Sequence, residues 1–171
     1  MSSFTAPVSV NVTTDRLSLR LWTMSEATSV LAGTRSSRWA GDFPAEGDRV
    51  IAGLLGQHPA WLGAYGHRLI TERESGLVVG SVGLFWPPSE GVIEIGYGIV
   101  PSRRGQGYAT EATQTLAEFV LSAPDVRMVS ASAELSNPAS VRVVEKAGFH
   151  WWATDESTAQ FRITRPGTAR G

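Results

Sequence analysis

The chain has 171 residues, of which 42% are hydrophobic and 18% charged, and its formal net charge is −1, so we expect one globular domain over residues 1–171 with a core from about 14 to 165. The balanced charge predicts no nucleic-acid partner, and the lack of cysteine excludes a disulfide framework, a thiolate nucleophile and a Cys-based metal site. No apolar run approaches the roughly 20 residues that span a bilayer, and the N-terminus lacks the pattern of a secretory signal, so we expect no membrane partner and a cytoplasmic location.

The first part of the chain predicts one strand followed by two helices. Residues 1 to about 14 are interpreted as a loose arm or an edge segment. In residues 16–22 leucines alternate with polar side chains, which indicates a half-buried strand. Helices are expected from Ser25 to near Gly33 and over about residues 47–57.

The middle of the chain predicts more strands and a longer helix. Three strand-like runs separated by turn residues predict an antiparallel meander over residues 61–72, 77–86 and 92–100. Apolar residues at helical spacing then predict a helix over about residues 108–122. A strand is expected over residues 127–135.

The last part predicts a helix and the final strands. The helix starts at Asn137–Pro138, where the missing N–H of proline has no cost, and ends at Gly148. Residues 149–163 supply one or two strands, and residues 165–171 are expected to form a frayed tail. This order of elements is typical of a mixed α/β, or α+β, domain rather than a doubly wound one.

Residues 93–109, IEIGYGIVPSRRGQGYA, combine a strand, a glycine-containing loop and a helix start. Backbone N–H groups of such a loop and first helical turn lack intrahelical partners and can bind an anion, and Gly105 and Gly107 let that backbone come close. A tight turn between a strand and a helix would also use these glycines. The third glycine of a dinucleotide fingerprint and the Gly-Lys-Ser/Thr of a Walker loop are absent, so neither of those sites is predicted.

The loop resembles a known family. Residues 104–109, RGQGYA, are similar to the Q/R-x-x-G-x-G/A pyrophosphate loop of the GNAT acyl-CoA N-acyltransferases. The similarity covers roughly residues 14–152 and extends to residues 15–20, 94–97, 137–140 and 145–149. These motifs look most like the ribosomal-protein N-terminal (Rim-type) acetyltransferases. The resemblance implies a central, mostly antiparallel twisted sheet of about six or seven strands flanked by about four helices.

The resemblance also implies a site for acetyl-CoA. Loop amides would hold the CoA pyrophosphate, at Arg104, Gly105, Gln106, Gly107, Tyr108 and Ala109. The backbone of Ile99 and Val100 would pair with the pantetheine arm, and Asn137 would bind that arm from the other side, in a gap where two strands separate. Arg103 is either a contact to a CoA phosphate or a solvated side chain.

The implied reaction is acetyl transfer to a primary amine by direct attack. An alkyl amine with a pKa near ~10.4 is almost wholly protonated at pH 7, so a base in the site lowers the cost of forming the nucleophile. Glu94 is the candidate base, because it is the only charge in residues 92–100 and its face is opposite to that of Ile93 and Ile95. The alternative is an exposed strand residue or a structural salt bridge.

A proton donor for the departing thiolate is harder to place. Many members of the superfamily carry a Tyr seven residues after the Asn, and that position here is Val144. The Rim-type subgroup instead carries a Ser three residues after the Asn, which fits Ser140. The alternative for Ser140 is a helix-start residue that bonds backbone. Tyr97 and Tyr108 are further candidates, with packing as the more ordinary role.

The acceptor and the partners are less defined. The implied acceptor is a protein N-terminus or a small-molecule amine, and a homodimer is possible, with Trp151 and Trp152 near its interface. No metal is expected, because the three histidines have no ligand spacing: His58, His67 and His150. The competing interpretation is a domain that binds acyl-CoA as a sensor or partner subunit without catalysis.

Overall fold

The computed structural model describes residues 11–165, which form eight strands and four α-helices. The predicted arm up to residue 10 and the predicted tail from residue 166 lie outside the described residues. The strands form one sheet in the order β1-β2-β3-β4-β5-β6-β8-β7. The strands are β1 (Val12–Thr13), β2 (Leu17–Leu21), β3 (His67–Glu72), β4 (Val78–Leu84), β5 (Val92–Ile99), β6 (Met128–Glu134), β7 (His150–Asp155) and β8 (Thr158–Thr164). The helices are α1 (Met24–Ala32), α2 (Glu46–Leu55), α3 (Tyr108–Val120) and α4 (Pro138–Lys146).

Local sequence explains where helices begin and end. Thr23 and Glu26 form a reciprocal capping box at the start of α1, in which each side chain accepts from the backbone N–H of the other residue. Gly33 ends α1 in the left-handed conformation at φ 77°. At the start of α4, Pro138 occupies the first turn as predicted, directly after the N-cap Asn137.

The mixed α/β fold is confirmed, and two details differ from the predictions. The strand expected over residues 61–72 begins only at His67, because Pro59 starts the 3₁₀ turn η1 (Pro59–Leu62), which buries Trp61. The sheet has eight strands rather than six or seven, because the short β1 pairs with β2 and the last segment folds into the β7–β8 hairpin. The predicted antiparallel meander is present as β3, β4 and β5.

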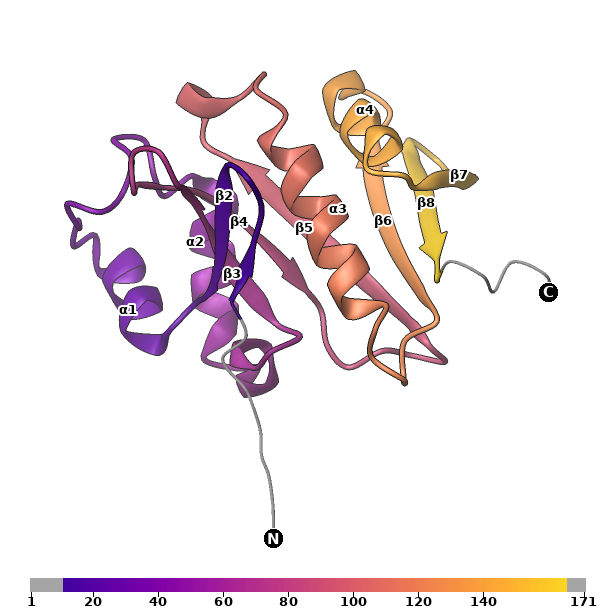
Figure 1. The fold of residues 1–171 in the computed structure, drawn as a ribbon, viewed down its shortest axis with the longest axis horizontal. Coiled ribbons are helices and arrows are strands. Elements are labelled where there is room, and N and C mark those ends of the chain that lie inside the picture. The colour runs from indigo at the N-terminus through magenta and orange to yellow at the C-terminus, as the bar shows by residue number, and fades with distance from the viewer. Residues whose placement is uncertain (1–10, 166–171) are drawn as a thin grey trace, which may run out of the picture.

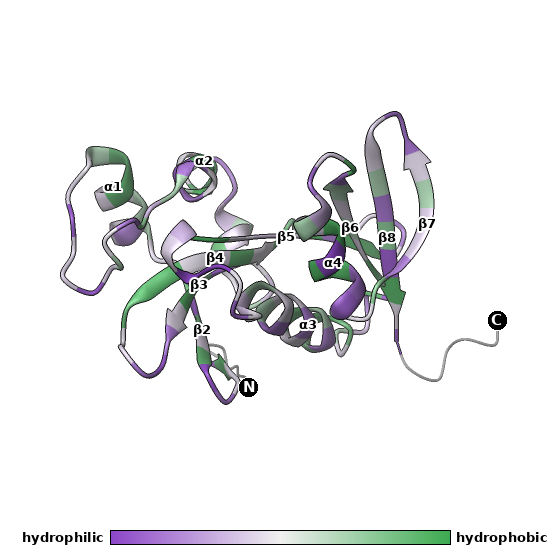
Figure 2. Cartoon of the chain, turned by 90° about the horizontal axis from the view of Figure 1, so that it is seen from above, coloured by the Kyte–Doolittle hydropathy of each residue, from purple (hydrophilic) through white to green (hydrophobic). Residues whose placement is uncertain are grey.

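The helices cover both faces of the sheet. Helices α1 and α2 lie over one face of the N-terminal half of the sheet, and α3 lies over the other face (Figure 2). Helix α3 packs against β5, and α4 packs against β6 and α3. Fully buried leucines from several layers form the core, including Leu19, Leu55, Leu69 and Leu116. One face of β5 is therefore covered by α3, and its other face is directed toward α2.

Strands β5 and β6 are parallel neighbours that separate part way along their length. They pair only from Val92 to Glu94, where Glu94 lies opposite Ser130. Beyond that point β5 continues to pair with β4 as far as Ile99, whereas β6 pairs with β8. Figure 1 shows the two strands diverging toward the end of the sheet where the loop after β5 and helix α4 lie. The candidate site lies at these separated ends.

Candidate functional site

A cavity of about 540 Å³ lies at the separated ends of β5 and β6. Its wall consists of the end of β5 from Tyr97 to Ile99, several residues of the segment 103–110, and α4 with its N-cap Asn137. We call it the loop cavity. Of the predicted cofactor residues, Val100 and Gln106 are not among those that line it. The structure therefore brings three predicted parts, the strand end, the loop and the Asn137 segment, around one space.

The loop has the backbone conformation that an anion site requires. Gly105 and Gly107 adopt left-handed φ angles of 79° and 84°, which glycine reaches without steric cost. Gly107 is the N-cap of α3, and no side chain of the described segment caps that helix end. The first N–H groups of α3 can therefore bind an anion in the loop cavity.

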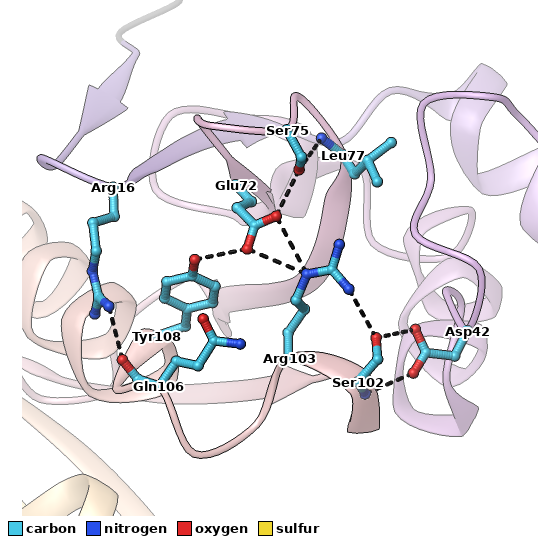
Figure 3. Close-up of polar contacts among 9 residues, drawn as sticks. All are labelled: Arg16, Asp42, Glu72, Ser75, Leu77, Ser102, Arg103, Gln106 and Tyr108. Atoms are coloured by element: carbon cyan, nitrogen blue, oxygen red, sulfur yellow. Dashed lines mark hydrogen bonds and ion pairs between the residues drawn. The ribbon is translucent and has the colours of Figure 1, made fainter.

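Contacts with distant segments hold the loop from its outer side (Figure 3). Arg16, just before β2, donates to the Gln106 carbonyl at 2.8 Å. The backbone N–H and the hydroxyl of Ser102 both donate to the Asp42 carboxylate at 2.8 Å. Because neither Ser102 nor Gln106 lines the loop cavity, these contacts restrain the loop without using groups that a ligand would need.

Glu72 is a mostly buried carboxylate at the end of β3 that holds the start of α3. It accepts hydrogen bonds from the Tyr108 hydroxyl at 2.7 Å and the Ser75 hydroxyl at 2.6 Å, and it pairs with Arg103 Nε at 3.2 Å (Figure 3). Burial raises the pKa of Glu72, but these three partners outweigh it and keep the pKa below its usual value. Arg103 is thus an internal tether. The same hydrogen bond raises the pKa of Tyr108 and commits its hydroxyl proton to Glu72.

The backbone of β5 presents alternate residues to the gap. The Val100 N–H donates to the Val79 carbonyl of β4 at 2.9 Å. In an antiparallel pair this alternation turns the backbone groups of Tyr97 and Ile99 away from β4 and toward the gap. The Ile99 carbonyl there accepts from Arg104 Nε at 2.8 Å. An extended ligand in the gap would therefore meet Ile99 and Tyr97, while the Val100 N–H is used within the sheet.

Tyr97 and Ser140 meet in the loop cavity, with their hydroxyl oxygens 2.8 Å apart. Asn137 Oδ1 accepts from the Ser140 N–H at 3.3 Å. Burial raises the pKa of Tyr97 more than its bond to Ser140 lowers it. Val144, at the position of the family's usual Tyr, is fully buried and offers no donor. Sequence reasoning treated Tyr97 mainly as packing, and only the contact with Ser140 shows its place in the site.

Glu94 stands apart from these groups. It is exposed, at the last residue of β5 that pairs with β6. Its neighbours Ile93 and Ile95 are buried, so Glu94 lies on the opposite face, as the alternation predicts. It makes no ion pair within residues 11–165, which removes the salt-bridge interpretation. It lines neither the loop cavity nor the second cavity described next.

A second cavity, of about 310 Å³, lies between the start of α2 and the strands β3 to β5. Its polar side chains include Asp48, His67 and Ser81. Asp48 is only 3% exposed, and its Oδ1 accepts from the Ser81 hydroxyl at 2.6 Å. We call this space the Asp48 cavity. Both cavities are lined by Arg104 and by residues 97–99, so they meet at the end of β5.

Sequence reasoning did not bring Asp48 and His67 together. Burial raises the pKa of Asp48 against the hydrogen bonds from Ser81 and Ala45 and the positive charge of Arg49, all of which lower it. Burial lowers the pKa of His67 to about 4, so the ring is neutral at pH 7. In the sequence, Asp48 is an ordinary acid in a first helical turn, and nothing in the pattern links it to a histidine on β3.

Two further classes of site were sought in the part of the chain that the structure describes. It holds no group of three or more His, Cys, Asp or Glu placed to bind a metal ion. It also has no helix with the length and apolar character needed to cross a membrane.

Comparisons with known proteins agree with this geometry. The sequence profile described as "Acetyltransferase (GNAT) domain" matches residues 16–150. The uncharacterized N-acetyltransferase YjdG of Bacillus subtilis (strain 168) is 37% identical over 82 residues, which are 47% of this chain and 49% of that protein. The chain thus aligns with about half the length of this curated relative.

Solved structures share the fold at low sequence identity. A GNAT-family acetyltransferase from Bacillus anthracis superposes with a TM-score of 0.66 at 20% identity, over 91% of this chain and 98% of that one. An acetyltransferase from Agrobacterium tumefaciens gives 0.64 at 20% identity, over 95% and 97%. The ribosomal L7/L12 α-N-protein acetyltransferase RimL, solved with coenzyme A, gives 0.65 at 18% identity, over 91% and 98%. Because the family profile covers most of the chain, the protein belongs to the GNAT acetyltransferase family.

Proposed function

We propose that the protein transfers an acetyl group from acetyl-CoA to a primary amine. The observation that carries this proposal is the gap between β5 and β6 with an anion-binding loop at its mouth. CoA combines an anionic pyrophosphate with an extended arm that contains amides. The loop offers N–H groups to the first, and the free edge of β5 offers backbone groups to the second. Membership of the family supports the same donor.

The donor would be held mainly by backbone. Amides of residues 104–109 bind the pyrophosphate, and the arm follows the edge of β5 at Ile99 and Tyr97. Asn137 contacts the arm from the opposite wall of the loop cavity, where its amide lies at the start of α4. Val100 was predicted to pair with the arm, but its N–H is already bonded to the Val79 carbonyl of β4. Its role would therefore be to fix the end of β5 in place.

Proton transfer would use groups on both faces of β5. The amine nitrogen attacks the thioester carbonyl carbon, and the C–S bond then breaks as the thiolate leaves. Glu94, on the α2 face of the strand, takes through an ordered water the proton that the ammonium group loses before it attacks, and the proton lost after the attack passes to solvent. The thiolate, whose thiol has a pKa near ~8.5, receives a proton from the Ser140 hydroxyl as the Tyr97 hydroxyl, 2.8 Å away, passes its own proton to Ser140, and solvent then restores the proton of Tyr97.

Other features of the protein remain predictions. The acceptor is a protein N-terminus or a small amine, the chain is one catalytic domain, and its location is the cytoplasm. A homodimer is supported by Trp151 and Trp152, which are 47% and 54% exposed on the edge strand β7. Sedimentation that shows only an 18 kDa species would exclude the dimer.

An acyl-CoA sensor without catalysis is the second candidate, and it is favoured by one observation, the absence of a hydroxyl at Val144. Release of free thiol from acetyl-CoA, measured with a panel of alkylamines and of peptides with free N-termini, separates the two. We expect release that depends on the amine. CoA binding without turnover on any amine would support the sensor, and failure of CoA to raise the melting temperature would contradict both candidates.

A further inference from the structure

The wall of the loop cavity carries positive charge and no negative charge. Its cationic side chains are Arg103, Arg104, Arg142 and Lys146, and none of the described residues that line it is Asp or Glu. The whole sequence, by contrast, has 16 Asp and Glu against 15 Lys and Arg. The excess of cations is therefore local to this cavity, and it favours a ligand with several negative charges.

Two of these cations already have partners on the protein. Arg103 is paired with Glu72, and Arg104 donates to a backbone carbonyl of β5. Arg142 and Lys146 are exposed, and neither takes part in an ion pair among the described residues. A ligand phosphate can therefore pair with both of them without breaking an ion pair of the protein.

The position of these two cations on α4 places them away from the reacting end of the donor. Arg142 and Lys146 are four residues apart on the helix, so they lie on the same face. Ser140, which the proposed reaction places at the thioester, lies near the start of the same helix. A rise of about 1.5 Å per residue puts Lys146 about 9 Å further along the axis than Ser140. The two cations therefore lie on the side of the nucleotide end of the donor.

The nucleotide end of CoA carries a phosphate that the loop does not account for. Besides its pyrophosphate, which we assign to the amides of residues 104–109, CoA has a separate phosphate on the 3′ oxygen of its ribose. Such a monoester has a charge of about −1.5 to −2 at pH 7 and three acceptor oxygens. Arg and Lys side chains offer several N–H donors, and hydrogen bonds between charged partners are the strong ones.

We propose that Arg142 and Lys146 bind the ribose 3′-phosphate of CoA. This inference rests on the proposed acetyl transfer and adds a specificity to it. The protein selects a free acyl-CoA over dephospho-CoA, and over a pantetheine arm attached to a carrier protein, which has no ribose phosphate. The pairing also makes donor affinity depend on the one lysine in the sequence, Lys146. Acetylation of Lys146 removes its charge and therefore weakens donor binding.

The first test compares two ligands and needs no variant. Dephospho-CoA lacks only the ribose phosphate and keeps the pyrophosphate and the arm. We expect calorimetry to show that the wild-type protein binds CoA about 10- to 100-fold more tightly than dephospho-CoA. Equal affinities would overturn the inference and leave the acetyl transfer intact, whereas failure of both ligands to bind would contradict the proposed function itself.

The second test removes the two charges together. Glutamine keeps a good helix propensity, so the double variant Arg142→Gln/Lys146→Gln should fold, and its preference for CoA should fall to about twofold or less. Its affinity for dephospho-CoA should not change. Arg49→Gln, at an exposed position of α2 outside both cavities, is the matched control and should keep the wild-type preference. An equal loss of affinity for both ligands in the double variant would place the cations at the pyrophosphate and overturn the inference.

Acetic anhydride provides a third test, because Lys146 is the only lysine that it can modify. Mass spectrometry follows the acetylation of Lys146, and saturating CoA should slow it more than saturating dephospho-CoA does. The acetylated protein should lose about as much CoA affinity as Lys146→Gln does. Lys146→Gln treated in the same way controls for modification of other groups and should lose no further affinity. Equal protection by the two ligands, or an acetylated wild type that keeps its CoA affinity, would overturn the inference.

Discussion

The two cavities that meet at β5 are built in opposite ways. The loop cavity takes most of its wall from one stretch, residues 97–110, and the groups that we propose to bind the pyrophosphate are backbone amides. The Asp48 cavity draws on α2, β3, β4 and β5, and its polar groups are side chains. Backbone geometry suits a donor that a whole family shares, whereas side chains from separate elements can change from one relative to the next. Changes around the Asp48 cavity should therefore leave the affinity for the donor intact.

Glu94→Gln should give the largest effect. If Glu94 is the base, kcat at pH 7 falls by roughly 10²- to 10⁴-fold, and the loss shrinks toward pH 10, where about a quarter of the amine is already neutral. CoA affinity should not change, because Glu94 lines neither cavity. Steady-state kinetics across pH provide the measurement, with exposed Glu118→Gln on α3 as the control. If Glu94→Gln keeps the kcat and the pH profile of wild type, Glu94 is not the base and is simply an exposed strand residue.

His67 should make stability depend on pH. Its pKa is about 4 in the folded chain and 6.5 when exposed, so between these values the unfolded chain binds a proton that the folded chain does not. The free energy of unfolding should therefore fall as pH drops from about 7 to 4, with a contribution of about 3 kcal/mol from this residue.

Urea unfolding at pH 7 and pH 4 measures this loss, and His67→Phe isolates it from that of the carboxylates. The variant should lose about 3 kcal/mol less than wild type over the same range. Equal losses in the two proteins would show that the ring is solvated and that the Asp48 cavity is more open than the structure shows.

Gly107→Ala tests the donor side. A side chain at φ 84° costs about 1–2 kcal/mol, and its Cβ would lie 3.3 Å from Arg16 Nη2, so the Arg16 side chain that holds the Gln106 carbonyl must move slightly. We expect CoA affinity to fall about tenfold by calorimetry while KM for the amine changes little. Gly33→Ala is the matched control, since it has φ 77° and no atom within 4 Å of the added Cβ. A similar loss of CoA affinity in both variants would mean that global strain, not loop geometry, is responsible.

Glu72→Gln should have the smallest effect. The amide keeps neutral hydrogen bonds to Tyr108 and Ser75 but loses the ion pair with Arg103. The loop then costs about 1 kcal/mol more to hold in place, which predicts a CoA dissociation constant about fivefold higher. A loss of a hundredfold or more would show that Arg103 and Tyr108 contact CoA directly. Glu72 would then be needed to position both side chains for that contact.

The contrast between the cavities also explains what the sequence could predict. The strand, loop and helix around Gly105 and Gly107 are contiguous, so their periodicity and glycines predicted the fold segment and the anion-binding backbone together. Asn137 and Ser140 could be placed only through the resemblance, because α4 reaches the loop through tertiary packing. The late start of β3 was missed since Pro59 favours a turn that hydrophobicity does not reveal.

The Asp48 cavity lay beyond sequence reasoning for a physical reason. Asp48, His67 and Ser81 come from three elements, and their common environment depends on the β3–β4–β5 register and on how α2 packs over it. Tyr97 is an intermediate case. The alternation along β5 predicted that Tyr97 lies on the face opposite to Glu94, but its partner Ser140 is 43 residues away in the chain and could not be inferred.

A crystal structure with bound CoA tests the central claim most directly, namely that the separated ends of β5 and β6 hold the donor. We predict pyrophosphate oxygens within hydrogen-bond distance of amides in residues 104–109, with the arm along Ile99 in the loop cavity and no part of CoA in the Asp48 cavity. Pyrophosphate bound away from the loop, or the arm seated beside Asp48, would contradict it.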